Sequence, residues 1–248
     1  MVKFSCHVCL ATSTTARAWE GMLSRPFDII GFDLDGTLAD TSGDLAEALN
    51  HALATIGRGP LPVADVQRMV GRGAKVMLTR ALGATGGAPQ DAVDQLFPIL
   101  IDHYAANIAV HSRPYPGVIA ALDALAAQGY RLAVCTNKIE RLARLCLDAL
   151  GMDKYFVAIV GGDTTARLKP DPTPLLAMIE QAGGGRTLFV GDSDNDILAA
   201  KAAGVASVAV SFGYVPGDPA ELGADALIDG FDELAPLVAN WAGQPTGR

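Results

Sequence analysis

Cysteine is scarce in this chain, and no pattern of metal ligands or disulfides surrounds it. The 248 residues contain 4 cysteines, and Cys6 and Cys9 flank His7 without a second ligand pair at a suitable spacing. We therefore expect neither a zinc site nor a disulfide framework. Because no long apolar run occurs either, the sequence favours a protein of the reducing cytoplasm that does not enter a membrane.

Positive charge is also in deficit. Lysine and arginine total 19 against 27 aspartates and glutamates, which gives a formal net charge of −8. Nucleic acids and anionic membranes bind basic patches, and no run of basic residues offsets the acidic balance here. We therefore expect no nucleic-acid partner and no membrane partner. The 50% of hydrophobic residues is enough for a large core of a soluble enzyme.

The first 26 residues differ from the rest because they lack both a strand pattern and the apolar stretch of a signal peptide. We expect residues 1–26 to be a disordered extension, with Met22 as a candidate alternative start, and residues 243–248 to be a flexible tail.

The most informative segment is residues 33–37, with the sequence DLDGT, which directly follows the apolar run Ile29–Phe32. Successive side chains of an extended chain point to opposite sides, so Asp33 and Asp35 share one side while Leu34 points into the core. Asp-Gly is also typical of hairpin turns, but the apolar residues that follow have helical spacing and offer no returning strand. The pair therefore suits a strand-to-helix loop in which one carboxylate attacks and the other transfers protons.

Three further segments also end apolar, strand-like runs: VCTNK at 134–138, LKPDP at 168–172 and FVGDSDND at 189–196. Ligands of an open parallel sheet bind at the carboxyl ends of its strands, so polar groups of these segments can converge although they are distant in sequence. The last segment also resembles the start of a calcium-binding EF-hand loop. That loop needs Gly and Glu where this chain has Ile197 and Ala203, which disfavours calcium.

Together, the four segments resemble the motifs of the haloacid dehalogenase superfamily of phosphohydrolases, and the resemblance covers about residues 27–240. Within it, VCTNK, GGDT at 161–164, KPDP at 169–172 and GDS at 191–193 are most similar to bacterial phosphoglycolate phosphatases. The resemblance implies a small anionic phosphate ester as the substrate, foremost 2-phosphoglycolate. Sugar phosphates, muramic acid phosphate, nucleotides and pyrophosphate remain open. Gly191 before Asp192 disfavours a phosphomutase, and four intact motifs disfavour a non-catalytic regulator.

The resemblance also implies a role for each residue. Asp33 is the nucleophile that forms an aspartyl-phosphate, and Asp35 is the general acid and base. The groups that would bind the phosphoryl oxygens are Gly36, Thr136, Asn137 and Lys169. By contrast, we take Lys138, Arg144 and Arg167 as ordinary surface charges and Asp194 as a solvated loop residue.

A magnesium ion is implied by the same resemblance. Asp33 and Asp192, with the main-chain carbonyl of Asp35, form an all-oxygen donor set of the kind that Mg²⁺ prefers, although Mn²⁺ stays open. Asp196 is expected just outside this set, where it would orient Lys169 or a metal-bound water.

The fold class predicted is α/β, a Rossmann-like doubly wound parallel sheet with an inserted all-helical cap. Strand patterns alternate with helical stretches from residue 130 onward, whereas residues 41–115 show helical spacing only. We therefore expect a catalytic core of residues 27–40 plus 116–242 and a cap of residues 41–115. The chain would cross between them at residues 38–42 and 113–118, where prolines and a glycine cluster.

The cap contains one candidate specificity loop, residues 71–75 with the sequence GRGAK, which opens a helix. Arg72 could bind the second anionic group of the substrate, while a solvated loop charge is the competing interpretation. His111 and Arg113 are weaker candidates. The sequence leaves open whether the protein is a monomer or a homodimer.

Overall fold

The computed structural model describes residues 25–87, 91–214 and 217–241. Most of the predicted N-terminal extension lies outside these residues, including Met22, Cys6 and Cys9. The predicted tail of residues 243–248 also lies outside them. The central element is a six-stranded sheet in the order β5-β4-β1-β6-β7-β8, in which all neighbouring strands are parallel. Its strands are β1 (Ile29–Phe32), β4 (Arg131–Cys135), β5 (Phe156–Val160), β6 (Thr187–Gly191), β7 (Ala206–Val210) and β8 (Ala226–Ile228). The predicted parallel α/β core is confirmed.

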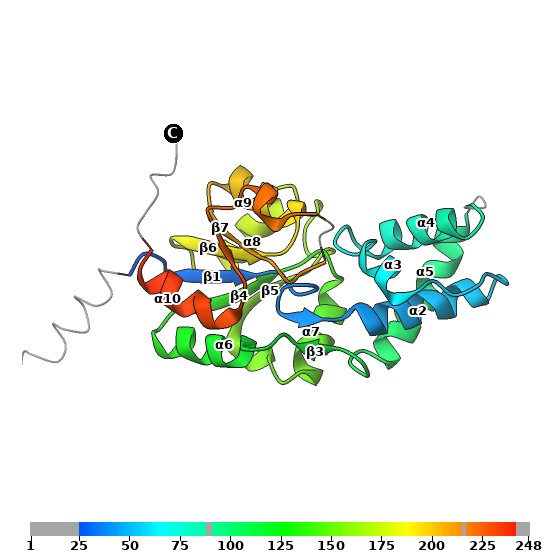
Figure 1. The fold of residues 1–248 in the computed structure, drawn as a ribbon, viewed down its shortest axis with the longest axis horizontal. Helices are drawn as coiled ribbons and strands as arrows, with labels where there is room; N and C mark the ends of the chain where they lie inside the picture. Colours follow the sequence, from blue (N-terminus) through cyan, green and yellow to red (C-terminus); the bar gives the residue numbers. More distant parts are fainter. Residues whose placement is uncertain (1–24, 88–90, 215–216, 242–248) are drawn as a thin grey trace, which may run out of the picture.

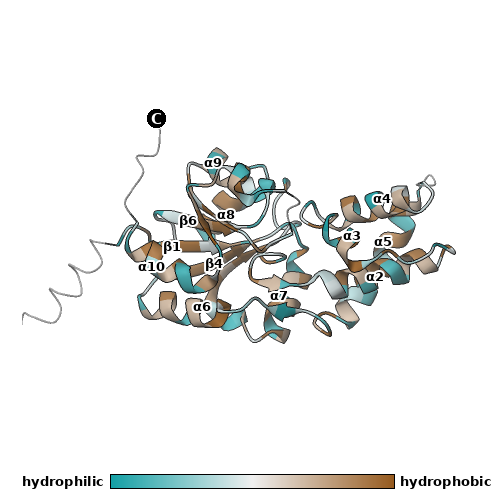
Figure 2. Ribbon diagram, viewed as in Figure 1, coloured by the Kyte–Doolittle hydropathy of each residue, from teal (hydrophilic) through white to brown (hydrophobic). Residues whose placement is uncertain are grey.

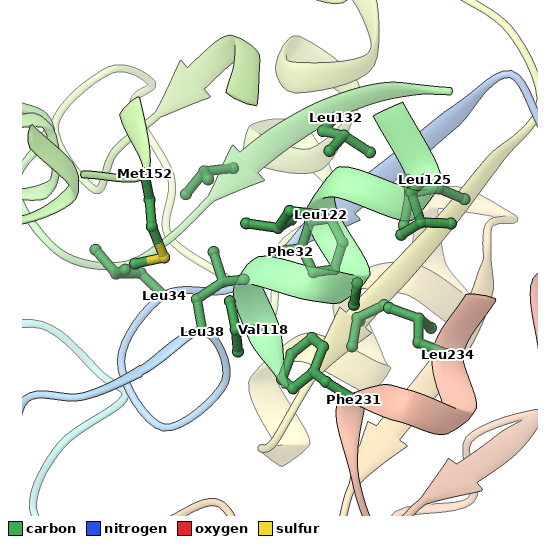
Figure 3. Packing of buried hydrophobic residues seen from close by; sticks show 14 of the residues in the cluster. Phe32, Leu34, Leu38, Val118, Leu122, Leu125, Leu132, Met152, Phe231 and Leu234 are labelled. Carbon is green, nitrogen blue, oxygen red and sulfur yellow. The ribbon is translucent and has the colours of Figure 1, made fainter. Parts of the chain in front are cut away.

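Helices cover both faces of this sheet (Figure 1). One face packs against α6 (Val118–Ala127), α7 (Glu140–Ala149) and α10 (Leu234–Ala239), and the other packs against α8 (Thr173–Gln181) and α9 (Asp194–Ala203). The buried strand β1 alternates between the two layers: Phe32 packs with Leu122 and Leu234 (Figure 3), whereas Ile29 packs with Met178 of α8. Leu34 is fully buried in the first of these layers, as predicted.

The four helices described between the short strands β2 and β3 form a separate group beside the carboxyl ends of the sheet strands (Figure 1). They are α2 (Ser42–Ala54), α3 (Val63–Gln67), α4 (Ala74–Ala84) and α5 (Ala92–Ala106). Each of α2, α4 and α5 carries both hydrophobic and hydrophilic residues along its length (Figure 2). Their apolar faces meet in a second hydrophobic cluster, which includes Leu49, Leu53, Leu78, Leu82, Leu96 and Leu100. We refer to this helical group as the cap.

Two very short strands join the cap to the core. β2 (Ala39–Asp40) pairs antiparallel with β3 (Arg113–Pro114), so the outgoing and returning chains lie side by side. The expectation of helices only for residues 41–115 is wrong at β3, because a two-residue strand is too short to show a periodic pattern.

A buried carboxylate anchors the returning chain. Asp44 in the first turn of α2 accepts hydrogen bonds from the main-chain N–H groups of His111 and Ser112, both at 2.8 Å, and from the Ser112 hydroxyl at 2.5 Å. Asp44 is 2% exposed, so these bonds replace its hydration. None of the helices described is long and apolar enough to span a bilayer.

We predict that Asp44→Ala destabilises the protein by about 2–4 kcal/mol, because it leaves buried N–H donors without an acceptor. The measurement is thermal unfolding, with an expected fall in Tm of roughly 5–15 °C. Asp65→Ala is the matched control, since Asp65 begins a cap helix but forms only an exposed pair with Arg68. An equal Tm shift for the two variants would contradict the anchoring role.

Candidate active site

A buried lysine lies among the carboxylates that follow the central strands. The Nζ atom of Lys169 is 3.0 Å from Oδ1 of Asp33 and 2.6 Å from Oδ1 of Asp196, and it donates to the carbonyl of Cys135 at 2.6 Å. The lysine side chain is 1% exposed. Burial alone would lower the pKa of the ammonium, but the charges of Asp196 and Asp33 raise it above its usual value. Lys169 therefore remains a cation.

One ammonium does not balance the acidic groups around it. Burial raises the pKa of Asp33 to about 6, with Lys169 opposing the rise and the charge of Asp196 adding to it. Burial and the charges of Asp196 and Asp33 likewise raise the pKa of Asp192 well above its usual value. Removing two such carboxylates from water is costly without a further cation.

The geometry fits a metal ion. Carboxylate oxygens of Asp33, Asp192 and Asp196 lie within 4.8 Å of one another. Asp196 already accepts from Lys169 and from the Ser193 hydroxyl, and its predicted orienting role stays a prediction. Oδ1 of Asp33 is buried, and its contact with Nζ of Lys169 at 3.0 Å is an ion pair without hydrogen-bond geometry; it accepts no hydrogen bond from the residues described. Asp33 and Asp192 are thus the two carboxylates best placed to hold a divalent cation.

Two glycines allow the main chain to approach Asp192. Its Oδ2 accepts from the N–H of Tyr214 at 2.7 Å, and its Oδ1 accepts from the Thr37 hydroxyl at 3.3 Å. A Cβ on Gly213 would lie 2.1 Å from the Cβ of Asp192. A Cβ on Gly36, whose φ is +88°, would lie 2.5 Å from Oδ2. The Gly36 N–H donates to the carbonyl of Ala39, so the predicted donation from Gly36 to a phosphoryl oxygen has no free N–H. The close approach to Asp192 is instead what requires a glycine here.

Asp35, the predicted proton carrier, is held by two donors. Its Oδ1 accepts from the Thr41 hydroxyl at 2.6 Å and from Nζ of Lys138 at 2.7 Å. The side chain of Lys138 is 4% exposed, so the interpretation of this residue as a surface charge is wrong. Burial would lower the pKa of Lys138, but Asp35 and Tyr104 raise it. Arg144 and Arg167 are exposed, as expected.

The strand-end residues Thr136 and Asn137 are buried, but they differ in what they can offer a ligand. Asn137 uses both amide hydrogens, donating to the carbonyls of Gly71 and Lys169, and its Oδ1 accepts from the Lys169 N–H. The predicted donation from Asn137 to a phosphoryl group therefore has no free side-chain N–H. Thr136 lines a cavity together with Asp33 and Asp35. Among the hydrogen bonds of the described residues, its Oγ1 accepts only the N–H of Lys138, at 3.3 Å. Its hydroxyl hydrogen can reach a ligand.

The cap loop predicted from the sequence contacts the core. The carbonyl of Gly71 accepts from Asn137 and, at 3.3 Å, from Asn195. Arg72 pairs with Asp194 at 2.9 Å, with both side chains about half exposed, so Asp194 is not merely solvated.

The loop lies between two cavities. The inner one has a volume of about 50 Å³ and is lined by Asp33, Asp35, Thr136, Lys138 and apolar cap residues. The outer one, of about 350 Å³, is lined by Asp192 and three arginines of the cap, Arg68, Arg72 and Arg80. His111 instead lies 3.3 Å from Glu47, two residues before β3. We refer to β2 and β3, which join the cap to the core, as the hinge.

Sequence reasoning missed Thr37, Thr41, Lys138 and Tyr214. Tyr214 connects the site to the hinge: its hydroxyl accepts from the Thr41 N–H at 2.6 Å and donates to Asp40 at 2.8 Å. Tyr214 follows the end of β7, so the strand-end rule used for the other motifs could have identified it, whereas the burial of Lys138, which follows β4, depends on its contact with Tyr104 of the cap.

These motifs and this fold match a known family. The sequence profile of haloacid dehalogenase-like hydrolases matches residues 30–210. The chain belongs to this family.

The similarity to known proteins extends over most of the chain. The phosphoglycolate phosphatase of Agrobacterium fabrum is 48% identical over 221 residues, which cover 88% of this chain and 95% of that protein. A solved structure described as a predicted phosphoglycolate phosphatase from Haemophilus somnus superposes with a TM-score of 0.80 at 35% identity, covering 85% of this chain and 97% of that one. CbbY of Rhodobacter sphaeroides in complex with xylulose-(1,5)bisphosphate superposes with a TM-score of 0.72 at 26% identity, covering 84% and 96%.

We predict that Asp33→Asn raises the Tm of this hydrolase by roughly 2–8 °C at pH 7.5 in the presence of a chelator. Because the folded pKa of Asp33 lies above its unfolded value, the ionised carboxylate destabilises the fold at neutral pH, and this penalty disappears as the pH falls towards 4. Scanning calorimetry at both pH values measures the difference. Asp148→Asn, at an exposed carboxyl, is the control. An Asn variant less stable than the parent at pH 7.5 would refute the argument.

Proposed function

We propose that this hydrolase is a Mg²⁺-dependent phosphatase that converts 2-phosphoglycolate to glycolate and phosphate. The observation that carries the proposal is the 48% identity to a phosphoglycolate phosphatase over 88% of the chain. The cluster of Asp33, Asp35, Lys169 and Asp192 supports it, since a dianionic phosphate needs both an attacking carboxylate and cations around it.

In the proposed mechanism, Asp33 attacks phosphorus and the bond from phosphorus to the ester oxygen breaks, which leaves an aspartyl-phosphate. Asp35 gives its proton to the departing oxygen. It then takes a proton from the water that hydrolyses the intermediate, which releases phosphate and restores Asp33. Lys169, 3.0 Å from Asp33, reduces the repulsion between the carboxylate and the incoming anion. The Thr136 hydroxyl would donate to a phosphoryl oxygen.

Asp33 and Asp192 would hold the metal ion, together with the main-chain carbonyl of Asp35. When bound, Mg²⁺ would neutralise charge on the carboxylates and on the phosphoryl oxygens. Gly71 and Arg72 of the cap would keep solvent water away from the aspartyl-phosphate through their contacts with Asn137 and Asp194.

The inner cavity favours a small substrate. Its 50 Å³ corresponds to a few water-sized groups, which suits a two-carbon ester better than a nucleotide. A sugar phosphate is the second candidate. It is supported by the structural similarity to CbbY, whose complex holds xylulose-(1,5)bisphosphate, and by the larger outer cavity with its three arginines.

We predict a clear preference for 2-phosphoglycolate in a panel that also contains sugar phosphates, muramic acid phosphate, pyrophosphate and a nucleotide. The measurement is phosphate release with Mg²⁺, compared as kcat/KM, with Mn²⁺ in parallel. A chelator should abolish turnover of every substrate and added Mg²⁺ should restore it. A higher kcat/KM for a sugar phosphate would replace the substrate while leaving the reaction type in place.

We predict that Asp33→Asn lowers kcat by at least about 1,000-fold on every ester, because the amide is a poor nucleophile. Asp35→Asn should lower kcat/KM on 2-phosphoglycolate by about 100- to 10,000-fold, but much less on p-nitrophenyl phosphate, because kcat/KM reports the step that forms the aspartyl-phosphate and the nitrophenolate leaving group needs no proton. The assay is steady-state phosphate release with the Asp148→Asn variant as control. Equal losses on the two esters would refute the assignment of Asp35 as the acid.

A further inference from the structure

Two buried polar groups beside the proposed reaction centre take no part in the mechanism above. Tyr104 of α5 is 1% exposed, and its hydroxyl makes no hydrogen bond among the residues described. The ammonium of Lys138 lies 4.6 Å from the centre of the Tyr104 ring. Both residues line the inner cavity together with Asp33 and Thr136.

We propose that Lys138 and the Tyr104 hydroxyl form the subsite that binds the carboxylate of the substrate. This inference rests on the proposed function, because it takes 2-phosphoglycolate as the molecule whose phosphoryl group lies at Asp33. A buried hydroxyl without a partner is costly, and a ligand acceptor would satisfy it. The subsite would accept an anion, since Lys138 can only donate and Tyr104 has an O–H to offer.

The partner of Lys138 changes in the course of the proposed reaction. Its ammonium bonds to Asp35 at 2.7 Å in the structure, yet Asp35 must turn to the ester oxygen to protonate it. A buried ammonium that loses its carboxylate needs another anion. The substrate carboxylate, two bonds from the ester oxygen, supplies that anion next to Asp35.

The rest of the inner cavity does not suit a sugar. Beyond the catalytic groups it is lined mainly by apolar side chains: Leu45, Val70, Met77, Leu100, Ile101, Ile139 and Leu142. Sugar hydroxyl groups placed there would lose their hydrogen bonds to water without replacement. A single carboxylate on a short carbon chain would instead meet one cation and one hydroxyl donor.

Arg72, the residue expected from the sequence to bind this carboxylate, lies outside the inner cavity. Its side chain is 51% exposed and already paired with Asp194. It lines the outer cavity together with Asp35 and Asp192, but the described lining of that cavity does not include Asp33 or Thr136. Lys138 shares a cavity with both of these phosphoryl-binding groups, so we place the carboxylate there.

The test compares 2-phosphoglycolate with 2-phosphoglycolamide, in which a neutral amide replaces the carboxylate. For each variant, the measured quantity is the ratio of kcat/KM for the acid to kcat/KM for the amide. Tyr104→Phe and Lys138→Met should each lower this ratio by about 10- to 100-fold, the loss expected for a charge-assisted hydrogen bond. A purely structural role would lower kcat/KM for the two substrates equally and leave the ratio unchanged.

Two further variants sharpen the comparison. Tyr155→Phe removes the same atom from a tyrosine whose hydroxyl bonds to Asp123 at the surface, and it should keep the ratio of the parent enzyme. Arg72→Ala should keep it within about twofold, in line with its pairing outside the inner cavity. Because Tyr104→Phe removes an unpartnered hydroxyl, its Tm should equal or exceed that of the parent. It therefore decides the question even if Lys138→Met fails to fold.

The outcomes separate the two proposals. If the parent enzyme prefers a sugar phosphate over 2-phosphoglycolate, the proposed function fails, and this inference fails with it. If the parent prefers 2-phosphoglycolate and its ratio persists in Tyr104→Phe and in folded Lys138→Met, the subsite is overturned while the function stands. A collapse of the ratio in Arg72→Ala alone would assign the carboxylate to the outer cavity and also overturn the subsite.

Discussion

The site depends on an electrostatic imbalance: buried carboxylates outnumber the ammonium that lies among them. Lys169 contacts Asp33 and Asp196, and Asp192 adds a further charge within the same few ångströms. In an interior of low dielectric, such charges interact far more strongly than in water. Burial, reinforced by the charge of Asp196, raises the pKa values of Asp33 and Asp192, and Lys169 only partly opposes the rise. The same imbalance would favour a divalent cation between Asp33 and Asp192, so the feature that destabilises the fold would prepare the proposed chemistry.

The parallel sheet makes this concentration of charge possible. Strand β1 lies between β4 and β6, and Phe32 at its end is in register with Val134 and Val190. The chain leaves all three strands at the same edge, so the loops that carry Asp33, Thr136 and Asp192 begin side by side. The apolar layers on both faces fix the strands, and the close approach of Gly36 and Gly213 to Asp192 completes the arrangement.

The core motifs could be predicted because each follows from a local pattern, an apolar run that ends in polar residues, together with a general rule about parallel sheets. The convergence of Asp33, Lys169 and Asp192 needed no knowledge of distances. Lys138 differs, because its burial depends on Tyr104, which belongs to a cap helix, and no periodic pattern indicates which cap residues face the core. The short strands of the hinge were not predicted for a related reason, because two residues are too few to show an alternation of polar and apolar side chains. Prediction succeeded where one element determines a position and failed where two independently folded surfaces meet.

The hinge and the reaction centre share hydrogen bonds, and this sharing links the position of the cap to the chemistry. The N–H of Tyr214 holds Asp192, while its hydroxyl binds the main chain of Thr41 and the carboxylate of Asp40 in β2. The hydroxyl of Thr41 in turn donates to Asp35. A rotation of the cap about β2 and β3 therefore displaces a partner of Asp35, and Lys138 would be affected as well because Tyr104 moves with α5. Asp35, the proposed proton carrier, is thus held by groups that would move with the cap, whereas Asp33 and Lys169 are held at the end of the sheet. Under the proposed mechanism, such a division would keep the nucleophile fixed while the position of the cap sets the availability of the acid.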